Sequence, residues 1–272
     1  MRYFRTLVTL LAGVIVASCG EKHEVKDITG PTAGAAVNFF NFGVNAPTVN
    51  FYANDKKLTA ASTTACNDGV TGATTDQTCL STGREPTGGT AYGQSANGNG
   101  VALYSSIAPG SYTLSGKITA TTDNGLSISN TQATFENGKF YSYYLSGIYN
   151  TTTKTVEGFV VDVPIPDLDF TKSYVRFVNA VSNSQPMTLY ASVGGAETPI
   201  GGSIAYKAAG AFVAIAPGIY DLNTRVAGSS TNVITRTAVT FAAGRVYTVA
   251  SRGDITATTG TNKPALDNTP SR

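Results

Sequence analysis

Short segments in which apolar and polar residues alternate recur along most of the chain. Gly, Pro or Asn residues bound these segments, and no stretch of a dozen residues beyond the N-terminus has the spacing of an amphipathic helix. A period of two is typical of β-strands that bury one face. The pattern therefore predicts an all-β fold. The expected inward-facing sets in the C-terminal half are Val175/Phe177, Leu189/Ala191/Val193, Val213/Ile215, Tyr220/Leu222 and Val239/Phe241.

The strand pattern occurs twice. Thr134–Tyr141 aligns without gaps on Thr240–Tyr247, and Ala108–Tyr112 corresponds to Ala216–Tyr220. Earlier landmarks in the same order are Phe39-Phe40-Asn41 with Phe177-Val178-Asn179, Tyr52-Ala53 with Tyr190-Ala191, and Ala91-Tyr92 with Ala205-Tyr206. The repeat predicts a first domain over residues 37–163 with an insertion at 54–100, a linker over 164–173, a second domain over 174–253 and a disordered tail over 254–272.

Each copy carries an Ala-Pro-Gly-x-Tyr segment. Proline presets the first corner of a type II turn and glycine supplies the positive φ of the second, so Pro109-Gly110 and Pro217-Gly218 predict such turns. We expect the rings of Tyr112 and Tyr220 to fill the core while their hydroxyls reach backbone at the rim. Tight turns are also expected at Gly138 and Gly244.

The second copy resembles a known bacterial family, the domain of unknown function 4397. The resemblance rests on the opening strand Tyr174–Ala180, the Pro-Gly-x-Tyr turn and the closing segment Gly244–Val249. It implies an immunoglobulin-like or transthyretin-like sandwich, found in exported and often lipidated proteins, with no catalytic residues. The first copy lacks the opening arginine and is assigned through the internal repeat. The predicted architecture is thus two tandem antiparallel β-sandwiches.

The N-terminus resembles the signal peptide of bacterial lipoproteins. Arg2 and Arg5 precede a short apolar run, and Val16–Cys19 places small residues directly before a cysteine. The run is too short to span a bilayer, so cleavage is expected to remove residues 1–18. Cys19 would then carry the acyl chains and residues 19–36 would form a tether. Because Gly20 is not aspartate, the resemblance favours the outer membrane. An ordinary secretory peptide and an uncleaved anchor remain alternatives.

Charge argues against nucleic acid as a partner. Removing Arg2 and Arg5 leaves 17 basic and 17 acidic residues, so the mature chain has no net positive field. Binding to nucleic acid depends on such a field. Membrane contact is therefore expected through the lipid anchor.

Two cysteines lie in the insertion. Cys66 and Cys79 are separated by 12 residues, and in an exported protein this spacing predicts a disulfide. Closing a loop of this length lowers the conformational entropy of the unfolded chain and so stabilises the fold by about 3 kcal/mol. Free or intermolecular thiols are the alternative. No neighbouring histidine or third cysteine completes a zinc site, so no metal is expected there.

Catalytic motifs are scarce. The single histidine, His23, lies in the predicted tether, which disfavours hydrolysis of the Ser-His-Asp type. No glycine-rich loop leads from a strand into a helix, so no nucleotide cofactor is expected. Carboxylate pairs of the glycosidase type cannot be recognised by spacing in an all-β chain. Asp162, Asp167 and Asp169 suggest calcium, but the intervening prolines favour a solvated acidic linker.

A run of tyrosines could contact a ligand. Alternation along one strand places Tyr143 beside Tyr141 on one face and Tyr144 on the other. Some of these rings must belong to the core. Tyr143, Tyr144 and Tyr149 are the candidate contacts for a sugar or a protein partner.

These observations predict a non-enzymatic cell-envelope lipoprotein that displays tandem sandwiches for binding or adhesion. Loops on a rigid scaffold, above all the insertion with Cys66 and Cys79, suit the recognition of a protein or glycan. One alternative is a structural spacer without a specific ligand. Another is an enzyme, or an accessory subunit, that acts on glycans.

Overall fold

The computed structural model describes residues 34–59, 89–96 and 104–271. In this part of the chain every regular element is a strand, and the strands form four sheets. Ala33–Arg272 is one compact unit. The all-β prediction is confirmed, and the four sheets are those of two β-sandwiches. Among the described residues, no helix is long and apolar enough to cross a membrane.

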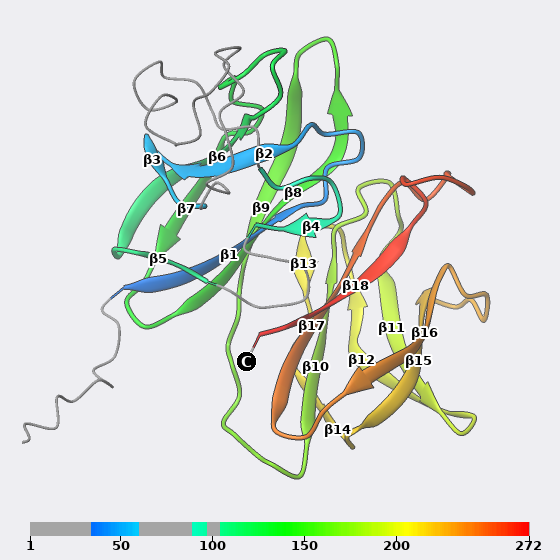
Figure 1. Cartoon of the computed structure of the whole chain (residues 1–272). Helices are drawn as coiled ribbons and strands as arrows, with labels where there is room; N and C mark the ends of the chain where they lie inside the picture. The colour runs from blue at the N-terminus through cyan, green and yellow to red at the C-terminus, as the bar shows by residue number, and fades with distance from the viewer. Residues whose placement is uncertain (1–33, 60–88, 97–103, 272) are drawn as a thin grey trace, which may run out of the picture. The chain divides into compact units, whose positions relative to one another are not determined.

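The first sandwich contains the strands β1 to β9 (Figure 1). One sheet has the order β4 (Gln94–Ser95), β1 (Ala35–Asn41), β8 (Phe140–Asn150) and β9 (Thr155–Asp162), with β5 (Ser105–Ile107) also paired to β1. The other has the order β3 (Lys56–Lys57), β2 (Val49–Ala53), β6 (Gly110–Ile118) and β7 (Thr131–Phe135).

The second sandwich repeats this topology strand for strand. One sheet has the order β13 (Ala208–Ala209), β10 (Ser173–Asn179), β17 (Arg245–Arg252) and β18 (Ala265–Pro270), with β14 (Val213–Ile215) also paired to β10. The other has the order β12 (Ala196–Ile204), β11 (Met187–Val193), β15 (Gly218–Val226) and β16 (Ile234–Phe241). The repeat in the sequence is therefore also a repeat of strand order.

The sheets are antiparallel, as predicted, except at one pair of strands in each sandwich. β1 runs parallel to β8, and β10 runs parallel to β17. The first strand of each copy lies beside the last but one, after the chain has passed through the other sheet. A parallel pair needs such a long connection between its strands, whereas a tight turn joins only antiparallel strands.

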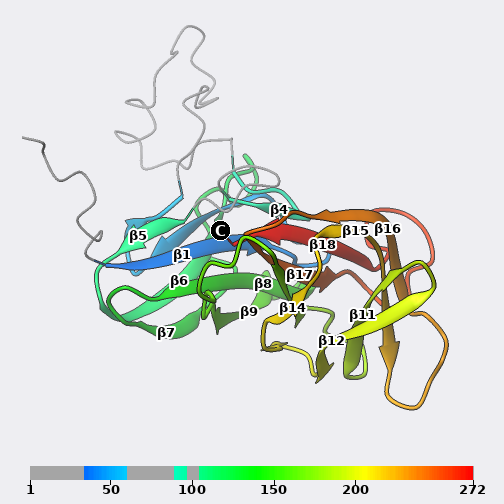
Figure 2. The ribbon, with the colours of Figure 1, turned by 90° about the horizontal axis from the view of Figure 1, so that it is seen from below.

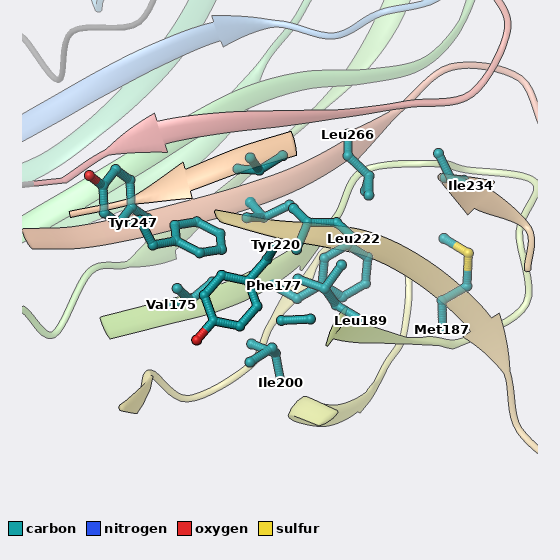
Figure 3. Close-up of a cluster of buried hydrophobic side chains, with 14 of the residues drawn as sticks. Val175, Phe177, Met187, Leu189, Ile200, Tyr220, Leu222, Ile234, Tyr247 and Leu266 are labelled. Carbon is teal, nitrogen blue, oxygen red and sulfur yellow. The ribbon is translucent and has the colours of Figure 1, made fainter. Parts of the chain in front are cut away.

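The core of the second sandwich confirms most of the predicted inward faces. Phe177, Leu189 and Leu222 are fully buried, and Figure 3 shows their side chains pointing toward one another from the two sheets. Val193 is the exception, with half of its side chain exposed. It ends β11 at the Gly194-Gly195 hairpin, where the facing sheet no longer covers it.

The tyrosine of the Pro-Gly-x-Tyr segment has the predicted role in both copies. The hydroxyl of Tyr112 donates to the Ala108 carbonyl at 3.0 Å, and that of Tyr220 donates to the Ala216 carbonyl at 2.8 Å. The predicted positive φ is present at Gly110, with φ of 147°, but the type II turn predicted at Gly218 is wrong, because Gly218 lies in the extended start of β15. A Cβ on Gly218 would lie 3.3 Å from the Tyr220 ring, so a side chain there would crowd the ring.

A second tyrosine closes the next turn in each copy. Gly138 and Gly244 have φ of 72° and 69°, which confirms the tight turns expected at both positions. The Tyr141 hydroxyl accepts a hydrogen bond from the Glu136 amide at 3.1 Å. The Tyr247 hydroxyl accepts one from the Ala242 amide at the same distance.

The predicted disordered tail over residues 254–272 is wrong. Ala265–Pro270 forms β18, which pairs with β17 and lies beside it in both views (Figures 1 and 2). Leu266 is 3% exposed and belongs to the second core. β18 is the counterpart of β9 in the first sandwich, so the second domain extends well beyond residue 253. The first described strand likewise begins at Ala35, before the predicted boundary at 37.

The two sandwiches pack against each other through their outer sheet faces. Alternate residues of β1, β8 and β9 point away from the first core, and those of β10 and β17 point away from the second. These residues form a buried cluster of their own: Phe40, Phe42, Tyr144, Phe159, Val161, Val178, Ala180 and Ala250. We call this cluster the junction. The first sandwich contributes the aromatic rings and the second contributes the smaller side chains, so the two faces interlock.

Polar contacts accompany the apolar junction. The Ser146 hydroxyl donates to the Ala180 carbonyl at 2.7 Å in a buried position. Arg176 is 1% exposed, and its guanidinium donates to the Thr248 hydroxyl and to the Asp162 carbonyl. Burial lowers the pKa of Arg176 below its usual value. Buried donors and acceptors that are paired across an interface fix the relative position of its two faces. Breaking such a hydrogen bond leaves a buried polar group without a partner, which costs free energy.

A surface contact at the junction predicts a small pH dependence. The Tyr206 hydroxyl lies 2.8 Å from the Glu157 carboxylate and, with Lys207 at 3.1 Å, lowers the pKa of Glu157. A lowered carboxylate pKa contributes stability above the pKa of the unfolded chain, and this stability is lost as pH falls through the folded pKa. We expect Glu157→Gln to cost less than about 1 kcal/mol at neutral pH. Urea unfolding should show the cost shrinking below pH 4.5. An unchanged cost at low pH would contradict this assignment.

Candidate binding cleft between the two sandwiches

A polar cleft of about 380 Å³ opens where three sheet edges meet. Strand β4 contributes one wall, and β16 and β18 of the second sandwich contribute the other. The lining residues are Phe40, Phe42, Tyr92, Gly93, Gln94, Ser95, Arg236, Asp267, Asn268 and Thr269. Amides, hydroxyls, a guanidinium and a carboxylate thus surround a small aromatic floor.

The segment that carries Tyr92 to Ser95 is held by a buried asparagine. Asn41 is fully buried at the end of β1, and its side-chain amide donates to the Thr90 carbonyl at 3.0 Å. The Gly93 amide donates to the Asn41 carbonyl at 2.7 Å. In the second copy, the equivalent Asn179 donates to the Ile204 carbonyl at 3.2 Å. The repeated asparagine therefore anchors the returning segment in both sandwiches.

Arg252 organises the wall of the cleft. Its Nε lies 2.5 Å from the Asp267 carboxylate, and its guanidinium carbon lies 5.1 Å from the centroid of the Tyr92 ring. Burial acts to lower the pKa of Arg252, but Asp267 and Tyr92 outweigh it and the pKa is raised. A partly desolvated pair of this kind is held more firmly than a surface ion pair. The Arg252 guanidinium and the Tyr92 ring are therefore preorganised.

Glycine is required beside this arginine. Gly93 has φ of 78°, and a Cβ there would lie 2.9 Å from the guanidinium carbon of Arg252. The backbone can approach the guanidinium only without a side chain. Across the cleft, Arg236 donates to the Leu266 carbonyl at 2.8 Å, which fixes a second guanidinium at the rim.

The cleft is chemically suited to binding. Gln94, Asn268 and Thr269 offer amide and hydroxyl groups to a polar ligand. Burial raises the pKa of Tyr92, so its phenol stays neutral. Among the lining residues the carboxylate is Asp267 alone, and it is engaged by Arg252. Glycoside hydrolysis uses two carboxyl groups across the scissile bond, and this lining supplies one.

A second pocket, of about 500 Å³, lies along the linker. Its lining is largely apolar and comprises Gly138, Lys139, Phe140, Asp162, Val163, Pro164, Ile165, Pro166 and Asp167. The predicted linker therefore packs beside the start of β8.

Several predicted site residues lie outside the described residues. These are Cys19, Cys66 and Cys79, together with His23. The lipid anchor and the disulfide stay predictions.

The expectation that Tyr143 and Tyr144 contact a ligand is wrong. Both are 0% exposed. The Tyr143 ring packs edge-on against Phe39, and its hydroxyl donates to the Ser129 hydroxyl at 3.1 Å. The Tyr144 ring stacks on Phe40 in the junction, with centroids 4.6 Å apart. One face of β8 lies in the core and the other in the junction, so neither ring is accessible.

Tyr149 is partly exposed and packs against the first core. It lies near the far end of β8 and is not among the residues that line the cleft. A role in ligand contact stays a prediction for this residue alone.

Of the three carboxylates considered for calcium, Asp169 makes local contacts. Asp169 accepts hydrogen bonds from the amide and hydroxyl of Thr171, at 2.8 and 2.7 Å. These bonds lower the pKa of Asp169. Within the described ranges, no group of three His, Cys, Asp or Glu residues is placed to share a metal ion.

The sequence contained one unused signal for the cleft. Ala91-Tyr92 and Ala205-Tyr206 are matching landmarks of the repeat, and in the structure each tyrosine contacts the other sandwich. Tyr92 lies on Arg252 of the second sandwich, and Tyr206 bonds to Glu157 of the first. Arg252 and Asp267 carried no signal, because only the pairing of β17 with β18 brings them together.

Comparison with known families concerns the second sandwich. Residues 173–269 match the family model "Domain of unknown function (DUF4397)". The DUF4397 match begins at the first residue of β10 and ends inside β18. The matched segment therefore includes the strand that the sequence pattern missed.

Other comparisons add little. No curated protein matches the chain. A crystal structure of a leucine-rich repeat protein from Bacteroides thetaiotaomicron VPI-5482 is similar at 9% identity and a TM-score of 0.19, over 82% of this chain and 26% of that one. The chain thus spans about a quarter of that protein's length, and the TM-score is too low for the likeness to guide interpretation.

Proposed function

We propose that this protein is a non-enzymatic lipoprotein of the cell envelope that binds a polar partner in the cleft between the two sandwiches. The cleft itself carries the proposal, because it gathers amide, hydroxyl and guanidinium groups at the point where the insertion returns to the fold at Tyr92–Ser95. Concave sites with a few well-placed polar groups are where ligands bind. The signal-peptide motif Val16–Cys19 supports anchoring through Cys19, with the outer membrane favoured.

The first sandwich is, in this proposal, a divergent copy of the DUF4397 domain. Its strand order, its parallel pair and its two tyrosine contacts repeat those of the matched second sandwich. The copies differ mainly at the insertion, so duplication followed by a gain of binding loops accounts for the architecture.

A binding role fits the arrangement better than a spacer does. The broad aromatic junction keeps the two sandwiches side by side, whereas a spacer gains length from domains placed end to end. Glycan is the favoured class of ligand, because saccharides present the hydroxyl groups that the side chains of Gln94, Asn268 and Thr269 can pair. A protein with a polar surface loop is the alternative partner.

Filling the cleft should abolish binding. Thr269 lines the cleft from β18, and Thr269→Trp should lower glycan affinity at least tenfold, about 1.4 kcal/mol. The measurement is retention of the Cys19→Ser protein, which is soluble without lipid, on an array of bacterial and host glycans. Thr240→Trp is the matched control, because Thr240 is an exposed strand residue of β16 away from the cleft.

Gln94→Ala tests the same site without added bulk. It should weaken retention by several fold while leaving the thermal midpoint unchanged. Equal binding by Thr269→Trp and Thr240→Trp, or retention of no glycan by the wild-type protein, would reject the cleft as a glycan site and favour the spacer.

A further inference from the structure

The strand register places Gly34 and the linker at the same end of the fold. Gly34, the first described residue, bonds to the β7–β8 turn through the Asn137 side chain at 2.7 Å and the Gly138 amide at 2.8 Å. Strand β9 also ends here, because Asp162 pairs with Tyr141 near the start of β8. The name tether end is used below for the end of each sandwich at which its first strand, β1 or β10, begins.

The two sandwiches point their tether ends the same way. Arg176, midway along β10, donates to the carbonyl of Asp162 at the end of β9. Farther along the strands, Ser146 bonds to Ala180. At the opposite end, the loop residues Asn45 and Asn262 bond through their side chains at 2.8 Å. These contacts follow one another in the same order along the strands of both sandwiches, so the two tether ends lie on the same side.

Exposed apolar side chains gather at the tether end. Seven large apolar residues of the described part are more than a third exposed, and five of them belong to elements of this end. They are Phe140 at the start of β8, Leu168 and Phe170 in the linker, Ile219 at the start of β15 and Val193 at the end of β11. Leu126 and Ile148 lie at the opposite end. Phe170 is the most exposed, at 75%, and the apolar linker pocket adjoins Phe140.

The length of the tether limits how far this end can be from a bilayer. Fourteen residues lie between Cys19 and Gly34, and a fully extended chain of that length spans at most about 50 Å. An acylated Cys19 would hold the tether end within that distance of the lipid. Exposed apolar groups held there gain by entering the interface, since apolar surface removed from water is stabilised.

We propose that the tether end rests on the membrane that holds the anchor, with Leu168 and Phe170 inserted into the lipid interface. The inference rests on the lipid anchoring of the proposed function. Exposed charges at this end are mixed, with Lys139, Lys172 and Arg245 offset by Asp162 and Asp167. The contact is therefore apolar and does not depend on anionic lipid. It also leaves Gln94 of the cleft far from the bilayer, because Gln94 pairs with the last residue of β1.

The absence of tryptophan from the chain allows a direct test. Phe170→Trp gives a single fluorescent reporter at the tether end, and Ile148→Trp gives one at the opposite end. Each lipidated protein is reconstituted in vesicles of phosphatidylethanolamine with phosphatidylglycerol. Phe170→Trp should emit at shorter wavelength and be quenched at least twofold by brominated acyl chains, whereas Ile148→Trp should not. Equal quenching of the two reporters, or quenching of neither, would overturn the proposal.

Two further measurements separate this inference from anchoring itself. The Cys19→Ser chain can be held on nickel-chelating lipid through a histidine tag at its N-terminus, and the quenching pattern should persist without acylation. If wild-type protein carries no lipid yet the tagged chain shows the pattern, anchoring fails and membrane contact stands. Replacing phosphatidylglycerol with phosphatidylcholine should leave the quenching unchanged. A loss on that exchange would contradict an apolar contact.

Discussion

Tyr144→Ala should lower the free energy of unfolding by about 3–5 kcal/mol, the usual cost of removing a large buried ring. Tyr144 is fully buried in the junction, where it stacks on Phe40 and Phe159 with centroids 4.6 and 5.2 Å apart. Burial raises its pKa to about 12, so the phenol is neutral at physiological pH. Because the ring belongs to the junction, its loss should uncouple the two sandwiches. Urea unfolding followed by circular dichroism measures the effect.

The controls separate the junction from the cores. Tyr144→Phe keeps the stacked ring and should cost less than about 1 kcal/mol, and Tyr149→Ala, at a partly exposed position, should cost less than Tyr144→Ala. Wild-type protein should unfold in one transition and Tyr144→Ala in two. Two transitions in the wild type would show that the sandwiches are independent.

Truncation after Pro264 should remove most of the stability of the second sandwich. The deletion eliminates β18, and with it Leu266 from the core and Asp267 from Arg252. Deleting one buried leucine side chain alone costs about 2–5 kcal/mol, and the lost strand pairing adds to this. Total stabilities of about 5–15 kcal/mol leave little after such a loss. Limited proteolysis with mass spectrometry measures the expected loss of protease resistance in the second sandwich.

Leu266→Ala is a milder change than this truncation, because it removes one core side chain and keeps β18. It should be less stable than the wild type but still resist proteolysis. A truncated chain that melts at the wild-type temperature would show that β18 is dispensable.

The cores could be predicted because their signals are local. Alternation identified Phe177, Leu189 and Phe241 as inward-facing, and the repeated Pro-Gly-x-Tyr segment identified the rim contact of Tyr220. Strand β18 was missed because it is an edge strand. Leu266 is its one residue in the core, and the Asp, Asn and Thr residues that follow read as a polar tail. The repeat still held the signal, since β9 follows the equivalent turn in the first copy.

The junction was hidden for a different reason. Strand β8 is apolar on both faces, which is typical of a strand that is covered on both sides. This pattern does not say what covers the second face, so a ligand contact stayed a candidate role for the rings of Tyr143 and Tyr144. The cleft depends on pairings between distant segments, Tyr92 with Arg252 and Arg252 with Asp267. Neither pairing leaves a periodic trace in the sequence.

Metabolic labelling with radioactive palmitate tests the lipid anchor, on which the proposed envelope role depends. Wild-type protein should incorporate the label and fractionate with outer membranes, and Cys19→Ser should do neither. Absence of label from the wild-type protein, or label retained by Cys19→Ser, would show that Cys19 is not the anchor.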